Sequence, residues 1–161
     1  ETIIEAFSEQ YKLNYTFLRY GSLYGPRAQA WNGLKNRVET IVNKKKLTYY
    51  GTGMEEREYI HIKDAANMTV KALSDKYINQ AVTLTGSQVI NSKALIEMIF
   101  EIANIKLDIE YKNPNKTNIK HYIKTPYRYT PKQSKKISPN EYIDFGQGLL
   151  EVIAEAYKKN N

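Results

Sequence analysis

The chain has 161 residues, 42% of them hydrophobic and 25% charged, which is ordinary for a globular protein of one compact domain. No apolar run approaches the roughly 20 residues needed to cross a bilayer, so we expect no membrane partner. Cysteine is absent. Its absence excludes disulfides, thiolate nucleophiles and thiolate metal sites, and it fits a cytoplasmic enzyme.

The chain is basic, with a formal net charge of +7 and a pI of about 9.3. Long-range attraction would then favour anionic partners, such as a nucleotide diphosphate. The alternative interpretation is that the lysines form a solvated surface and bind no partner. The clusters at 44–46, 135–136 and 158–159 are typical of exposed helix ends and loops.

Helical and extended patterns alternate along the chain, which predicts an α/β fold. In order, we expect a helix over 2–12, a strand over 14–20, a helix around 34–42, strands over 47–50 and 58–62, a helix after Asp64, a strand over 81–85, a helix after Ser92, a strand over 107–111, a loop-rich segment over 112–142 and a last helix around 149–157. Asp64 and Ser92 are predicted N-caps. The helix after Asp64 is expected to pack through residues that include Ala65, Met68 and Leu73.

Two runs carry the most specific signals. FLRYGSLYGPR, over 17–27, has the form of a buried strand that ends in a ligand-facing loop. YYGTGMEEREYIHIKD, over 49–64, places Arg57 shortly after a Gly-x-Gly turn. Together they resemble the motifs of the extended short-chain dehydrogenase/reductase family, the NAD-dependent epimerases and dehydratases of nucleotide sugars. The matching positions are Leu18, Arg19, Ser22, Tyr24, Gly25, Pro26 and Arg27, then Gly51, Gly53, Arg57, Glu58, Tyr59, Ile60, His61, Ile62 and Asp64.

The resemblance covers most of the chain and implies the C-terminal, substrate-binding portion of an extended Rossmann-type enzyme, with mixed short strands and helices. Residues 1–30 would be the end of the catalytic helix plus a strand and loop of the cofactor domain. Residues 31–161 would form the substrate-binding region, with 81–103 returning to the cofactor sheet. The Gly-rich fingerprint and the catalytic Tyr-x-x-x-Lys would precede Glu1. We therefore expect NAD or NADP in a full-length parent, none tightly bound to this chain, and no activity from this chain alone.

One literal Tyr-x-x-x-Lys spacing occurs, at Tyr59 and Lys63, and we reject it as a catalytic pair. In the family the Lys lowers the pKa of a Tyr acid/base from the same helix face. Residues 58–62 alternate like a strand, in which four residues span about 13 Å. A lysine so distant could not act on the tyrosine, and we assign no catalytic residue to this chain.

Arg57 matches the family arginine that holds the phosphates of the sugar nucleotide. Its planar guanidinium suits phosphate oxygens and makes charge-assisted hydrogen bonds with them. The alternative is an exposed arginine paired with Glu55, Glu56 or Glu58. Glu58 is expected to orient the loop or the arginine rather than to do chemistry.

The end of the first predicted strand is expected to face the ligands. By resemblance, Tyr20 and Gly21 border the nicotinamide. Ser22 stands where the family usually has Asn, and it is expected to meet both the cofactor and the substrate diphosphate. Its hydroxyl is shorter than an amide and has a single donor, which puts the diphosphate contact in question.

Asn32 and Trp31 lie just before the second predicted helix. Relatives contact the nucleotide phosphate at the position of Asn32, where helix N-terminal N–H groups could bind an anion. The other interpretation of Asn32 is a helix cap. Trp31 either stacks on a base or anchors the core.

Arg128 is expected to be a second, late basic residue on the phosphates. Lys116, Lys120 and His121 compete with it for this role. No metal site is expected, because two histidines, His61 and His121, without cysteines do not make one.

The leading hypothesis is a fragment of an NAD(P)-dependent nucleotide-sugar epimerase or dehydratase of polysaccharide biosynthesis, which grips the nucleoside diphosphate of its substrate. A nucleotide-sugar ketoreductase fragment would use the same parts. A non-enzymatic alternative is a basic nucleic-acid-binding module, supported by the pI and by 14 tyrosines that could stack on bases. The basic residues form no known reading motif, so we do not expect nucleic acid as a partner.

The resemblance also predicts incomplete burial. The strand over 14–20 should have few strands beside it, which would leave an unpaired edge. Ile3, Ile4 and Phe7 should expose an apolar helix face, and an exposed apolar face favours association. We therefore expect a homo-oligomer.

Overall fold

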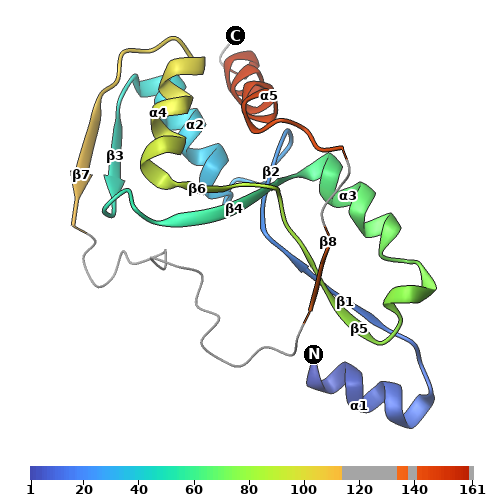
Figure 1. Ribbon diagram of the computed structural model, residues 1–161. Helices are drawn as coiled ribbons and strands as arrows, with labels where there is room; N and C mark the ends of the chain where they lie inside the picture. The colour runs from blue at the N-terminus through green and yellow to red at the C-terminus, as the bar shows by residue number, and fades with distance from the viewer. Residues whose placement is uncertain (114–133, 138–140, 160–161) are drawn as a thin grey trace.

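The structure is a computed structural model that describes residues 1–113, 134–137 and 141–159. Helices and short strands alternate, which confirms the predicted α/β class (Figure 1). The elements are α1 (Thr2–Tyr11), β1 (Thr16–Tyr20), β2 (Ser22–Tyr24), α2 (Gly33–Lys44), β3 (Leu47–Tyr50), β4 (Glu56–His61), α3 (Ile62–Lys71), a 3-10 turn (Asp75–Tyr77), β5 (Gln80–Leu84), β6 (Val89–Asn91), α4 (Ser92–Ile102), β7 (Ile109–Lys112), β8 (Lys135–Ile137) and α5 (Phe145–Lys158). Within these described ranges, no helix is both long and apolar enough to cross a bilayer.

The first sheet has the order β1-β5-β8, and its strands are parallel. Phe17 of β1 lies opposite Ala81 of β5, and β1 forms an edge of this sheet. In the part of the chain that the structure describes, no strand pairs with the outer side of β1, as the sequence predicted for residues 14–20. One face of the sheet buries Val82 and Leu84 against Met68 of α3.

Two further ladders position the site. β2 pairs in parallel with β4, so that Ser22 lies opposite Tyr59. β4 also pairs antiparallel with β6, where Arg57 faces Ile90. β3 and β7 form a separate parallel pair. β4 therefore lies between β2 and β6, the strand that leads directly into α4.

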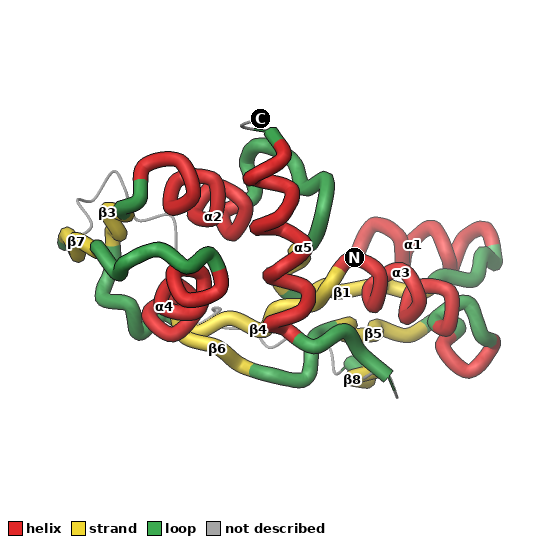
Figure 2. Tube along the Cα trace, turned by 90° about the horizontal axis from the view of Figure 1, so that it is seen from above, coloured by secondary structure: helices red, strands yellow, loops and turns green. Residues whose placement is uncertain are grey.

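The larger core is built by α2, α4 and α5 around β3 and the end of β2. Each helix buries apolar side chains at spacings of three and four residues, which is the pattern of one helix face. These residues are Leu34, Val38, Ile41 and Val42 of α2, Leu95, Ile96, Ile99 and Phe100 of α4, and Leu149, Val152, Ile153 and Ala156 of α5. Seen from above, α2, α4 and β3 lie on one side of the molecule and α1, α3, β1, β5 and β8 on the other, with α5 and β4 between them (Figure 2).

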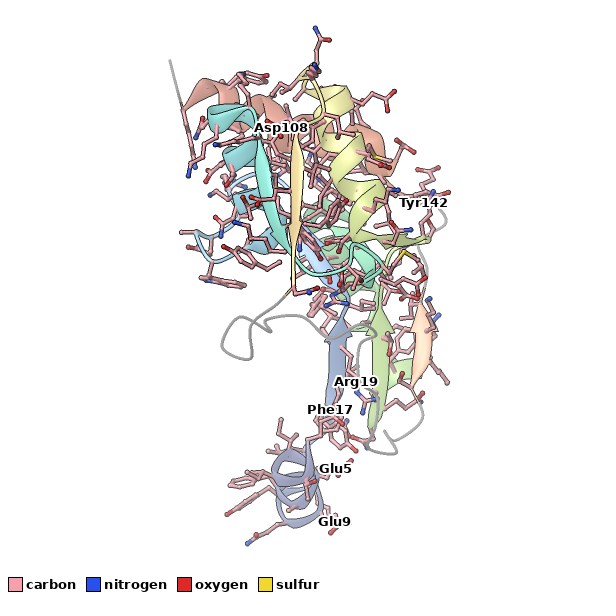
Figure 3. All side chains as sticks on the ribbon, turned by 90° about the vertical axis from the view of Figure 1, so that its left-hand side faces the viewer. Glu5, Glu9, Phe17, Arg19, Asp108 and Tyr142 are labelled. Atoms are coloured by element: carbon pink, nitrogen blue, oxygen red, sulfur yellow. The ribbon has the colours of Figure 1, made fainter. Side chains whose placement is uncertain are left out.

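Helix α1 stands apart at one end of the molecule (Figure 3). It buries no residue, and Ile3 and Phe7 keep 75% and 54% of their surface exposed. Glu1 pairs with Arg19 of β1 at 2.6 Å, which ties the start of the helix to the sheet. The exposed apolar face is the one predicted from the sequence, whereas self-association stays a prediction.

Both N-cap predictions were wrong, because each observed cap lies one to three residues before the predicted one. α3 begins at Ile62, and its cap is His61, whose Nδ1 accepts from the backbone N–H of Lys63. Asp64 instead accepts from the backbone N–H of Ile143. For α4 the cap is Asn91 rather than Ser92, because the amide oxygen of Asn91 accepts from Ala94.

Short strands and the ends of helices were also misjudged. β2, β6 and β8 have three residues each, too few for a period of two to show, and β8 lies inside the segment predicted to be loop-rich. Leu73 was assigned to the buried face of α3, but it lies beyond the helix end and is exposed.

Gly86 is required by a close approach of two backbones. A Cβ atom there would lie 1.9 Å from the carbonyl oxygen of Tyr59, whereas a Cβ at Gly33 would meet nothing within 4 Å. We expect Gly86→Ala to lower the free energy of unfolding by about 3 kcal/mol, because the backbone must move. Gly33→Ala, the control, should change it by less than about 0.5 kcal/mol. Urea denaturation measures both, and equal stabilities would contradict the close approach.

Candidate functional site

An open cleft of about 380 Å³ lies where β2 and β4 meet the first turns of α2 and α4. Its lining brings together residues from four separate stretches of the sequence, at 21–23, 31–37, 57–59 and 92. They are Gly21, Ser22, Leu23, Trp31, Asn32, Gly33, Leu34, Arg37, Arg57, Tyr59 and Ser92. Four residues proposed from the sequence, Gly21, Ser22, Asn32 and Arg57, thus share one cleft.

Arg57 lines the cleft from β4 and is half-buried. Its Nη1 donates to the backbone carbonyl of Glu56 at 2.6 Å. Among residues 1–113, 134–137 and 141–159, no carboxylate lies within ion-pair distance of its guanidinium. Glu58, expected to orient the arginine, instead pairs with Lys136 of β8 at 3.3 Å. The Arg57 charge therefore remains available to an anion in the cleft.

The three residues expected near the cofactor, Tyr20, Gly21 and Ser22, do not all line the cleft. Gly21 and Ser22 line the cleft, but Tyr20 does not. The Tyr20 hydroxyl lies 2.5 Å from the Thr69 hydroxyl on α3. The backbone N–H of Gly21 donates to Leu84 of β5, at 2.9 Å. A nicotinamide contact by these residues stays a prediction.

Asn32 is used as the cap of α2. Its Oδ1 accepts from the backbone N–H of Lys35 at 3.0 Å, and its Nδ2 donates to Leu23 at 3.1 Å. Both halves of its amide are therefore engaged in holding the helix start against β2. Trp31 is 82% exposed and lines the cleft, so it does not anchor the core.

Arg37 is the cleft residue that the sequence analysis missed. It lies one turn into α2, and its Cζ stands 5.3 Å from the centre of the Tyr49 ring. The helical pattern gave its position, since Arg37 precedes buried Val38 and follows the cap by about one turn. The signal that could have found it is a cation just beyond the first turn of a helix already suspected of meeting a phosphate.

Glu55, the residue immediately before β4, is 5% exposed. Its carboxylate accepts from the Tyr49 hydroxyl at 2.8 Å, from the Thr52 backbone N–H at 2.7 Å and hydroxyl at 2.9 Å, and from the Gly53 backbone N–H at 2.9 Å. Burial alone would raise its pKa, but these hydrogen bonds outweigh burial and lower the pKa to about 2. The carboxylate thus stays charged and closes the turn that leads to Arg57.

The Gly51-Thr52-Gly53 turn is not suited to a dinucleotide phosphate. It joins two strands rather than a strand and a helix, and Glu55 already accepts from the backbone N–H groups of Thr52 and Gly53. The backbone N–H groups of this turn are therefore not available to a dinucleotide phosphate, and whether the chain binds NAD stays a prediction. Over the described part of the chain, no three acidic, His or Cys side chains gather at a position that could hold a metal ion.

Part of the sequence argument against a Tyr59–Lys63 catalytic pair was wrong, and the rejection of this pair stays a prediction. Tyr59 lies in β4, but Lys63 lies in α3 rather than in a continuing strand. The Lys63 ammonium pairs with Glu151 of α5 at 3.0 Å. His61 is buried beside them, with Nε2 3.6 Å from the Glu151 carboxylate, and burial lowers its pKa. These contacts serve the packing of α3 against α5.

Arg128, with its competitors Lys116, Lys120 and His121, lies outside the described residues. The late basic residue proposed from the sequence therefore stays a prediction.

Comparisons with known proteins identify relatives of this arrangement. The family model described as "NAD dependent epimerase/dehydratase family" matches residues 1–83. The chain is 25% identical over 156 residues to a UDP-glucuronate 4-epimerase of Thermodesulfobacterium geofontis, a match that covers 95% of this chain and 46% of that protein.

Two solved structures illustrate the likeness of fold. A UDP-glucose 4-epimerase of Thermotoga maritima, solved with UDP-glucose, has a TM-score of 0.79 and 21% identity over 99% of this chain and 51% of that one. A UDP-glucuronic acid 4-epimerase of Bacillus cereus, solved with UDP-glucuronic acid and NAD, has a TM-score of 0.75 and 17% identity over 98% and 50%. The chain thus spans about half the length of the relatives it matches.

Glu55 yields a pH-dependent prediction. Its pKa falls from 4.5 to about 2 on folding, so its stabilisation is present above pH 4.5 and is lost as the pH falls toward 2. We expect Glu55→Gln to lower the free energy of unfolding at pH 7 by about 2–3 kcal/mol, with a smaller difference below pH 4.5.

Denaturant titrations at several pH values measure this difference. Glu56→Gln is the matched control, because Glu56 is the exposed neighbour and offers only its backbone carbonyl to Arg57. A Glu55→Gln variant with the stability of the unmodified chain at pH 7 would contradict the assignment.

Proposed function

We propose that this chain, which belongs to the NAD dependent epimerase/dehydratase family, binds the nucleoside diphosphate of a nucleotide sugar in the cleft that contains Arg57. The observation that supports this is the convergence of the Arg57 guanidinium and the capped start of α2 on one open cleft. Both are attractive to phosphate oxygens, and they come from separate parts of the sequence.

The electrostatics of the cleft favour an anion of this kind. The N-terminus of a helix carries about half a positive charge, and its first N–H groups point outward along the axis. Asn32 fixes the start of α2 through both atoms of its amide. Because no described carboxylate pairs with Arg57, a diphosphate would not compete with an existing ion pair.

The proposal for the whole protein is a nucleotide-sugar epimerase or dehydratase that uses NAD or NADP. The solved relatives with UDP-glucose, or with UDP-glucuronic acid and NAD, support this substrate class and cofactor. Residues outside these 161 would supply the Gly-rich turn and the catalytic Tyr and Lys, so this chain alone would be inactive. Gly21 and Ser22 would border the nicotinamide, and Arg128 would join the phosphates.

Removal of Arg57 tests the binding function. We expect the chain to bind UDP saturably and Arg57→Ala to weaken binding about 10- to 100-fold, because charge-assisted hydrogen bonds to phosphate are lost. Lys106→Ala, which removes an exposed charge from the loop after α4, should leave the affinity unchanged.

Isothermal titration calorimetry measures these affinities, with circular dichroism to confirm that each variant is folded. A folded chain that binds no UDP, or an Arg57→Ala variant that binds as well as the control, would contradict the proposal.

A further inference from the structure

We infer that Arg37 is a second phosphate-binding cation of the cleft, held ready for its ligand by Tyr49 and Glu55. This inference rests on the proposed function, and it adds a residue that contacts the second phosphate of the nucleoside diphosphate. The observation that carries it is a half-buried arginine that makes a cation–π contact with Tyr49 and lines the same cleft as Arg57.

The cation–π contact leaves the guanidinium able to bind. Arg37 Cζ lies 5.3 Å from the centre of the Tyr49 ring, within the range of a cation–π contact. Such a contact engages the charge of the guanidinium and does not use up its N–H donors as hydrogen bonds to a carboxylate or carbonyl would. No described carboxylate forms an ion pair with Arg37. The side chain is therefore oriented but not neutralised.

The ring beneath Arg37 is fixed by a buried hydrogen bond. Tyr49 is 5% exposed, and its hydroxyl donates to Glu55 Oε2 at 2.8 Å. The other oxygen of Glu55 accepts from the backbone and hydroxyl of Thr52. A tyrosine with a buried, bonded hydroxyl has one orientation, so Arg37 contacts a rigid surface.

The same carboxylate also sets the position of Arg57. Glu55 closes the turn two residues before Arg57 and accepts from the N–H of Gly53. One buried anion therefore fixes both the surface under Arg37 and the start of the strand that carries Arg57. Two guanidiniums held in this way suit a ligand with two adjacent phosphates, because less side-chain freedom is lost on binding.

The test compares UDP with UMP on the full 161-residue chain. For the unmodified chain we expect UDP to bind more tightly than UMP. Arg37→Ala should weaken UDP binding about tenfold and change UMP binding less than about twofold, so the preference for the diphosphate shrinks. Arg37→Lys keeps the charge but loses the planar guanidinium. Its affinity for UDP should lie between those of the unmodified chain and Arg37→Ala. Lys44→Ala, at the exposed far end of α2, is the control of equal charge.

The outcomes separate this inference from the proposed function. If Arg57→Ala no longer binds UDP while Arg37→Ala binds UDP with the affinity of the Lys44→Ala control, Arg37 does not contact the ligand. The inference is then wrong and the proposed function stands. If Arg37→Ala weakens UDP and UMP equally, Arg37 only maintains the shape of the cleft, and the inference is wrong. A folded chain that binds no UDP overturns both.

Discussion

The buried carboxylate of Glu55 is the interaction on which the rest of the cleft depends. It lies between two glycines with positive φ and the strand that carries Arg57, and it accepts four hydrogen bonds from three residues. A buried charge without such partners would be strongly destabilising. Because every donor is local, Glu55 converts a flexible Gly-x-Gly turn into a rigid corner. Glu55 contacts Tyr49, which in turn contacts Arg37 of α2. Glu55 also precedes β4, whose residues Arg57 and Tyr59 line the cleft.

The arrangement also explains how a basic chain can use its charge selectively. Most lysines in the described part of the chain lie on the surface and either face water or pair with carboxylates, as Lys63, Lys136 and Lys159 do. Pairs of this kind contribute little to stability or recognition. The two cleft arginines differ, since they are half-buried and have no carboxylate partner among the described residues. Location and pairing, rather than the net charge, distinguish the cleft from the solvated surface.

The sequence could predict the fold where long periodic patterns exist. The helical spacing of Leu34, Val38 and Ile41 gave α2, and the motif around Arg57 gave the strand that reaches the cleft. Three-residue strands such as β2 were not predictable, because they are defined by pairing with distant partners. The position of Arg37 near the start of α2 was predictable, but its contact with Tyr49 and the role of Glu55 were not. Both depend on Tyr49, and no sequence pattern shows that its ring lies between them.

The pairing of β1 with β5 has a consequence for how the chain acquires its structure. Thr16 lies opposite Gln80, so the two partners are 80 − 16 = 64 residues apart in sequence. Parallel contacts over such separations slow folding, since a long loop must close before any hydrogen bond forms. During synthesis, residues 1–20 would therefore emerge well before their partner strand, with Phe7 and Leu18 accessible. Until β5 has been made, the apolar side chains of this segment favour association with other chains.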